Sequence, residues 1–246
     1  MSDRDDCILA HIGLYHLSLR PVIEELFFEG RNCGNVIQRL VAAKQLQSRD
    51  GLPGRLSYYQ LSRGEANRRG LPASRARPPQ NQALHTALAV LWFCTMSGPG
   101  RHRLEPAELD RAFPQCPPNG IHCIERDRNT FRLFRMKVTD PTSDDAGLLR
   151  SLRKSVFETA DLPGLRPWMQ TGRYCFAILT ETETRVQRIR ELIQADEQLV
   201  DVATFIVEQA PGVRTLNQAL HERQPRSLSP KLQCSPAETE NLRRQP

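Results

Sequence analysis

The segment from residue 32 to residue 61 constrains the fold most, because its hydrophobic pattern changes period partway along. Its first half carries apolar residues at helical spacing, which predicts a short helix with one buried face. Those residues are Val36, Ile37, Leu40 and Val41. A turn containing glycine and proline follows, and then an alternating run with two adjacent tyrosines, which predicts a strand. We expect this helix to be followed by a β-hairpin, whose turn is the glycine- and proline-containing segment and whose second strand carries the tyrosines.

Two further helices are predicted in front of this one. Apolar residues spaced for a first helix are Ile8, Ile12, Tyr15 and Leu19. Pro21 suits the first turn of a second helix, which Glu29-Gly30 should end. Asn32 is a candidate N-cap for the third helix, and Ser62-Arg63-Gly64-Glu65 has the spacing of a capping box for a later one.

The polar side of the third helix carries the side chains that match base edges in a DNA major groove. Asn35, Gln38 and Arg39 share that side with the small Ala42, and we expect the three polar residues to contact bases. Asn32 is included in this predicted DNA-binding surface. Candidate phosphate contacts lie before the helix, at its end and around the predicted hairpin turn. They are Arg31, Lys44, Arg49 and Arg55, the last two near the tip of the hairpin.

Charge is distributed unevenly along the chain. The formal net charge of the 246 residues is +6, which permits nucleic-acid binding without requiring it. Between residues 31 and 77, however, only Asp50 and Glu65 oppose the cations, and such a local excess attracts phosphates. The cations are Arg31, Arg39, Lys44, Arg49, Arg55, Arg63, Arg68, Arg69, Arg75 and Arg77.

Residues 5 to 70 resemble winged helix-turn-helix regulators. The resemblance rests on the run from Arg39 to Leu46, the turn, the tyrosine strand and the closing Leu61-Ser62-Arg63-Gly64-Glu65. It implies that residues 1–70 form a domain that binds double-stranded DNA. Winged helices also bind proteins, so an adaptor subunit of a larger nucleoprotein complex is an alternative. Residues 71–82 are basic and rich in proline, which is typical of a linker.

Residues 83–210 predict a second domain with a mixed sheet. Helical patterns are expected at 83–96, 105–113, 144–159 and 182–195, and strands at 121–126, 130–138, 174–179 and 203–207. Together with the first domain this is an α+β chain. Residues 211–246 have no core-forming stripe and are expected to be a largely disordered tail.

This order of domains is similar to the replication-relaxation family of bacterial mobile elements. That family joins a winged helix to a domain of the PD-(D/E)xK restriction-nuclease type, whose carboxylates hold Mg²⁺. At the corresponding positions this chain has Pro118-Asn119-Gly120 and Arg135-Met136-Lys137. An amide and a cation replace the two carboxylates, and only Lys137 fits the motif. The resemblance therefore implies an inactive nuclease-like domain that acts in replication, transcription control or defence, with Arg135 and Lys137 left to bind phosphates.

Two rival interpretations involve other side chains. Glu125 and Asp127 form an acidic-x-acidic pair, and a Mg²⁺-dependent nuclease would result if they met Asp140, Asp144 or Asp145. Cys116, His122 and Cys123 are candidate metal ligands. We expect instead no metal and no cofactor, with reduced structural thiols, because no C-x-x-C pair occurs among the seven cysteines.

Localisation is expected to be cytoplasmic. No apolar run approaches the roughly 20 residues of a membrane span, and the N-terminal Met1-Ser2-Asp3-Arg4-Asp5-Asp6 does not resemble a secretory signal. The sequence does not define an oligomeric state.

Overall fold

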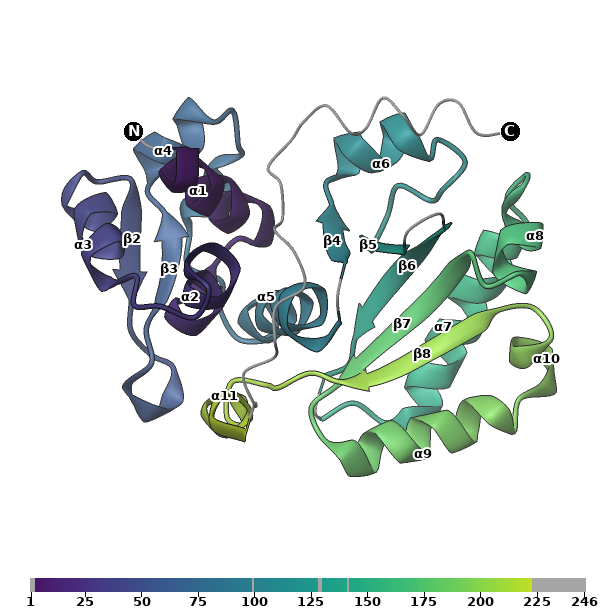
Figure 1. The fold of residues 1–246 in the computed structure, drawn as a ribbon. Helices are drawn as coiled ribbons and strands as arrows, with labels where there is room; N and C mark the ends of the chain where they lie inside the picture. The colour runs from purple at the N-terminus through teal and green to yellow at the C-terminus, as the bar shows by residue number, and fades with distance from the viewer. Residues whose placement is uncertain (1–2, 99, 128–129, 141, 223–246) are drawn as a thin grey trace. The chain divides into compact units, whose positions relative to one another are not determined.

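The computed structural model describes residues 3–98, 100–127, 130–140 and 142–222, and these fall into two compact units (Figure 1). The first unit contains the described residues up to Met96 together with those from Pro211 onward. The second unit runs from Ser97 to Ala210. The chain therefore leaves the first unit, builds the second and returns.

Three helices and a small sheet form the front of the first unit. The helices are α1 (Asp3–Tyr15), α2 (Arg20–Phe28) and α3 (Gly34–Ala42). Pro21 lies in the first turn of α2, and Glu29 ends that helix in the left-handed conformation at φ 56°, both as predicted. Leu19 does not extend α1 as expected. His16 adopts a φ of 75° and ends the helix, so Leu19 enters a strand instead.

The sheet of this unit has the order β1-β3-β2 and is antiparallel throughout. Its strands are β1 (Ser18–Leu19), β2 (Leu46–Arg49) and β3 (Tyr58–Leu61). The predicted hairpin is confirmed as β2 and β3, joined by a loop with one short helical turn, η1 (Pro53–Arg55). Apolar side chains of α1, α2, α3 and the sheet form one core, with Ile12, Ile23 and Leu40 at most 1% exposed.

Residues 62–96 also belong to the first unit. Ser62 caps α4 (Arg63–Arg68) by accepting a hydrogen bond from the Glu65 amide, as predicted. The expected linker instead contains a short helical turn, η2 (Ala73–Ala76), and packs on this unit. The Arg77 carbonyl accepts from the buried Gln60 Nε2 at 3.2 Å, and Arg75 donates to the Leu14 carbonyl. These long-range contacts fix the segment.

Helix α5 (Gln82–Trp92) continues into a π-helical turn at Phe93–Ser97. The predicted helix at 83–96 is thus present, but its residues up to Met96 group with the first unit rather than with the second. Helix α11 (Leu216–Glu222) also belongs there. The expected disordered tail therefore contains an ordered part, in which Leu216 is 1% exposed. The rest of that expectation, residues 223–246, lies outside the described residues.

The second unit is built on a five-stranded mixed sheet of order β4-β5-β6-β7-β8. The first three strands are antiparallel neighbours, and β6, β7 and β8 run parallel. The strands are β4 (Arg101–Leu104), β5 (Ile121–Asp127), β6 (Thr130–Val138), β7 (Tyr174–Thr180) and β8 (Thr204–Gln209). The predicted β5–β6 hairpin and mixed sheet are confirmed.

One face of this sheet packs against helices, and Ile124, Leu133 and Phe176 contribute to that core. The helices are α6 (Pro106–Ala112), α7 (Asp145–Ala160), α8 (Leu165–Gln170), α9 (Glu183–Gln194) and α10 (Glu197–Val200). Strand β4 and helices α8 and α10 were not predicted. Each is short, so its sequence shows little periodicity.

Among the described residues, five buried cysteines lie outside any disulfide, in agreement with reduced structural thiols: Cys33, Cys94, Cys116, Cys123 and Cys175. Cys7 departs from that expectation, because it is disulfide-bonded. Among the described residues, no helix combines the length and apolarity needed to cross a membrane.

Candidate nucleic-acid interface

Helix α3 has the two-sided character that its sequence predicts. Ile37 and Leu40 are buried at 4% and 1% exposure, whereas Asn35, Gln38 and Ala42 are exposed. The Arg39 side chain is 61% exposed. The three polar side chains predicted to contact bases therefore lie on the solvent side of a helix whose other side is anchored in the core.

The start of α3 is held by a small polar network. The Asn32 side-chain oxygen accepts from the Gly34 amide at 2.7 Å and from Arg20 Nη2 at 2.9 Å. Arg20 in turn donates to Glu24 on α2. The predicted cap is therefore one residue out of register: Cys33 is the N-cap and Asn32 stabilises the preceding turn. Since the Asn32 amide oxygen is already used twice, its role here is to position the helix.

Arg39 is tied to the first helix. Its Nη2 donates to both carboxylate oxygens of Asp5 at 2.7 and 2.8 Å, and the Asp5 side chain is only 7% exposed. The contact joins residues 34 positions apart, and local sequence patterns do not signal it. It fixes the direction of Arg39 on the exposed surface of α3.

The two hairpin arginines that were predicted to contact phosphates, Arg49 and Arg55, differ in exposure. Arg55 is exposed at the end of η1, at a φ of 59°. Arg49 is not at the tip: it is the last residue of β2, paired with Tyr58 and partly buried. It donates to the Gln47 side chain, and its Nε is buried without a hydrogen-bond partner among the described residues. Most of the Arg49 side chain therefore packs against neighbouring residues and is shielded from solvent.

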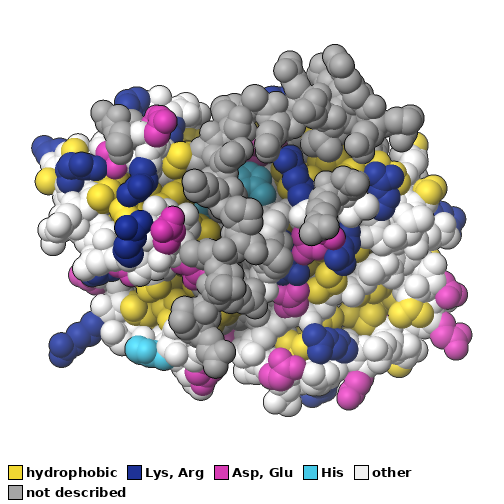
Figure 2. Space-filling view, viewed as in Figure 1, with side chains coloured by type: hydrophobic (Ala, Val, Ile, Leu, Met, Phe, Trp, Pro, Cys, Tyr) yellow, Lys and Arg dark blue, Asp and Glu magenta, His cyan; other side chains and the backbone are white. Residues whose placement is uncertain are grey.

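The remaining predicted cations of this surface are exposed. Lys44 follows α3 in the left-handed region at φ 55°. Arg31 is 74% exposed and pairs with Glu29 at 3.4 Å. Figure 2 shows lysine and arginine side chains of the first unit interspersed with acidic ones. Three of the arginines counted from the sequence pair with carboxylates outside residues 31–77, namely Arg31 with Glu29, Arg39 with Asp5 and Arg69 with Asp6, so the local cationic excess is smaller than the sequence suggests.

A second cationic position lies in the other unit. Arg135 and Lys137 point to the helix-covered face of β6, because residues two apart share a face. Arg135 Nη1 donates to Thr159 Oγ1 on α7 at 2.8 Å, and the Lys137 ammonium contacts Ser151 Oγ. Burial, followed by the charge of Arg135, lowers the pKa of Lys137. The loop at Asn119 and Gly120 lies beside Arg135, since a Cβ at Gly120 would stand 3.3 Å from Arg135 Nε.

His122 adjoins this pair and is buried at 2% exposure. It is paired across the sheet with Arg135, and its Nε2 lies 3.1 Å from the Tyr174 hydroxyl. Burial, with a smaller effect of Arg135, lowers the pKa of His122 to about 4. His122 is therefore neutral at physiological pH and adds no charge.

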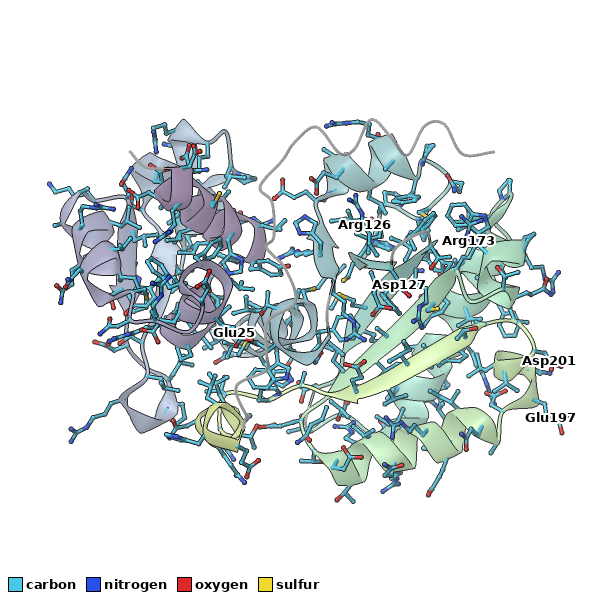
Figure 3. All side chains as sticks on the ribbon, in the orientation of Figure 1. Glu25, Arg126, Asp127, Arg173, Glu197 and Asp201 are labelled. Atoms are coloured by element: carbon cyan, nitrogen blue, oxygen red, sulfur yellow. The ribbon has the colours of Figure 1, made fainter. Side chains whose placement is uncertain are left out.

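The acidic residues of the rival nuclease interpretation are not brought together. Glu125 accepts from Arg101 at 2.8 Å and lies 3.1 Å from Arg132. Asp127 ends β5 (Figure 3), at the opposite end of the hairpin from Asp140. Glu125 is also far from Asp140. Its partner across the hairpin, Arg132, lies eight residues before Asp140, which is about 26 Å along an extended strand. No described group of three or more His, Cys, Asp or Glu side chains is placed to hold a metal.

The three candidate metal ligands diverge as well. His122 and Cys123 are adjacent on β5 and therefore point to opposite faces of the sheet. Burial raises the pKa of the Cys116 thiol to about 12. A thiol that holds its proton so firmly is a poor metal ligand.

A pocket of about 410 Å³ that the sequence did not indicate lies where α7 and α9 begin. It is lined by Ser143, Asp144, Asp145, Thr182, Thr184, Arg185 and Arg188. Its two arginines both pair with Asp145, and Arg185 also donates to the Asp140 and Ser143 carbonyls. The contacts satisfy the pocket's own charges and tie the loop before α7 to α9.

Comparison with models of protein families, with curated proteins and with solved structures finds no match for this chain.

Proposed function

We propose that the first unit binds double-stranded DNA, with α3 in the major groove and the β2–β3 hairpin beside it as a wing. The observation that carries this proposal is the exposed row of Asn35, Gln38 and Arg39 on a helix anchored by Ile37 and Leu40. Planar amide and guanidinium groups match the donor and acceptor patterns of base edges.

The order of elements supports this assignment. The chain runs from α1 through β1 to α2 and α3, and the β2–β3 hairpin of the three-stranded sheet follows α3 directly. This is the arrangement in which a helix-turn-helix protein inserts its second motif helix into the groove while the hairpin approaches the backbone. Lys44 and Arg55 are exposed at the end of α3 and on the hairpin, where phosphate contacts are needed.

The direct test is selection of binding sites from random duplexes by the full chain, repeated at several salt concentrations. Arg39→Ala should relax the selected sequence and weaken specific binding by ~1–3 kcal/mol. Arg55→Ala should weaken binding to all duplexes alike and reduce the salt dependence by about one phosphate contact.

Arg188→Ala is the matched control, since Arg188 is a 69% exposed arginine on α9 of the other unit. It should leave the selected sequence unchanged. Equal losses on every duplex for Arg39→Ala and Arg55→Ala would overturn the division between base and phosphate contacts. A protein that shows no retention on DNA at low salt would overturn the function itself, and co-purification of a protein partner would then indicate an adaptor.

The process served by this binding is proposed from the resemblance of the sequence alone. It would be replication, transcription control or defence in a mobile element, with the second unit acting as a nuclease-like scaffold without catalysis. Replacement of the motif carboxylates by Asn119 and Arg135 supports the absence of Mg²⁺-dependent cleavage.

A further inference from the structure

We infer that Arg135 and Lys137, together with the hydroxyl groups of α7 that face them, form a binding site for one phosphate group in the second unit. The inference does not depend on DNA binding by α3. It assigns a ligand class to a position where two cations lie with no carboxylate between them.

The first step is the unbalanced charge. In the part of the chain that the structure describes, neither Arg135 nor Lys137 forms an ion pair, although both are partly buried. Their recorded partners on α7 are the neutral hydroxyls of Thr159 and Ser151. Two like charges that are partly withdrawn from water repel each other and gain from a counter-ion.

The second step is the arrangement of the hydroxyl groups on α7. Ser151, Ser155 and Thr159 recur every four residues on α7, so they form one row along the helix. Two of them contact the cations of β6, which places this row along the same side of the sheet. The position therefore offers two cations and the hydroxyl groups of Ser151 and Ser155, because the Thr159 hydroxyl already donates to the Ser155 carbonyl. The neighbouring His122 is neutral.

The third step is the choice of anion. Arg135 and Lys137 are two residues apart on an extended strand, a spacing of about 7 Å. A single planar carboxylate would satisfy the guanidinium and leave the ammonium unbalanced. A phosphate monoester carries close to two negative charges at pH 7 and three acceptor oxygens, which matches two cations and their hydroxyl neighbours. Free phosphate and the phosphorylated end of a nucleic-acid strand share this chemistry.

The experiment measures the reactivity of Lys137 in the unaltered full chain. The sequence contains four lysines, namely Lys44, Lys137, Lys154 and Lys231. An amine-reactive reagent is applied with inorganic phosphate or with chloride at matched ionic strength, and modification is read at each lysine by mass spectrometry. Lys154 is the internal control because its side chain is 77% exposed on α7.

Phosphate should reduce modification of Lys137 by roughly fivefold or more and leave Lys154 within about twofold. Equal protection of the two lysines, or no protection of either, would overturn the inference. Phosphate affinity is then compared by titration in Lys137→Met and Lys154→Met proteins. The first variant should lose roughly tenfold or more and the second should bind like the unaltered chain.

The source of the phosphate is distinguished with short single-stranded oligonucleotides that differ only in a 5′-phosphate. Stronger protection of Lys137 by the phosphorylated strand would identify a strand end, and protection by free phosphate alone would identify a small-molecule anion. These outcomes are independent of α3, because an Arg39→Ala protein should show the same protection of Lys137.

Discussion

Arg39 on α3 and Asp5 on α1 form a two-point ion pair, in which one guanidinium nitrogen lies 2.7 and 2.8 Å from the two carboxylate oxygens. The carboxylate is nearly buried, whereas the arginine is largely exposed. In the free protein the proposed base-contacting arginine is therefore already held by an internal anion. DNA must either accept Arg39 in this orientation or compete with Asp5 for it.

Replacing Asp5 with Asn should strengthen binding to the selected duplex more than to unrelated duplexes, because it releases the proposed base-contacting Arg39. Because the arginine end of the pair is largely exposed, the pair contributes about 1 kcal/mol, so its removal should raise affinity by up to roughly fivefold. Fluorescence anisotropy with a labelled duplex at fixed salt measures the effect. Asp6→Asn is the matched control, because it makes the same change of charge one residue away, where the partner is Arg69. An equal gain for Asp6→Asn would show that net charge, not release of Arg39, is responsible.

The wing turn and α11 make the second prediction. Gly54 has a φ of +71°, and a Cβ built there would lie 2.5 Å from Asn217 Nδ2. Gly54→Ala should therefore lower the free energy of unfolding by about 1–2 kcal/mol, through backbone strain and through this close approach. Chemical denaturation of the full chain is the measurement.

The two causes can be separated within the same chain. Asn217→Ala in the Gly54→Ala background should recover part of the loss, since it removes the close contact but not the strain. Gly51→Ala provides the comparison, because Gly51 also has a positive φ but has nothing within 4 Å of its would-be Cβ. If Asn217→Ala recovers nothing, α11 does not pack against the turn in solution.

The local parts of this fold were predictable because each has its own periodicity. The apolar stripe of α3 fixes which side is exposed, and alternation on either side of a short turn defines the β5–β6 hairpin. The cap at Ser62 is also local, since it involves only residues up to Glu65.

Long-range features were not predictable from these patterns. The pairing of Arg39 with Asp5 and the packing of residues 70–77 on the first unit depend on contacts between distant parts of the chain. The same holds for α11, whose seven residues carry too little periodicity to distinguish an ordered helix from a tail. Arg49 shows the reverse error: its position near the predicted turn indicates an exposed charge, but its side chain is packed.

Arg101 makes the third prediction. It joins Glu125 on β5 to Glu208 on β8, and its side chain is only 8% exposed. Arg101→Met would leave the partly buried Glu208 without its cation and Glu125 with only the exposed Arg132, so we expect a loss of roughly 3–5 kcal/mol in the free energy of unfolding. Arg132→Met is the control: Arg132 also pairs with Glu125 but is 53% exposed, and its loss should be below about 1 kcal/mol. Similar losses for both variants would contradict the structural role of Arg101.

The fourth prediction concerns pH and His122. Burial lowers its pKa from 6.5 to about 4, so between these values the unfolded chain binds a proton that the folded chain does not. Stability contributed by neutral His122 is therefore complete above pH 6.5 and is lost as pH falls toward 4. The loss across that window is on the order of 3 kcal/mol.

His122→Asn removes the titrating group while retaining a polar side chain beside the Tyr174 hydroxyl. The difference in unfolding free energy between the two proteins, measured by denaturant titration at pH 7 and pH 4.5, cancels the carboxylates that titrate in both. That difference should shift toward the variant as the pH is lowered. A difference that stays constant would mean that His122 is solvated and titrates normally in the folded protein.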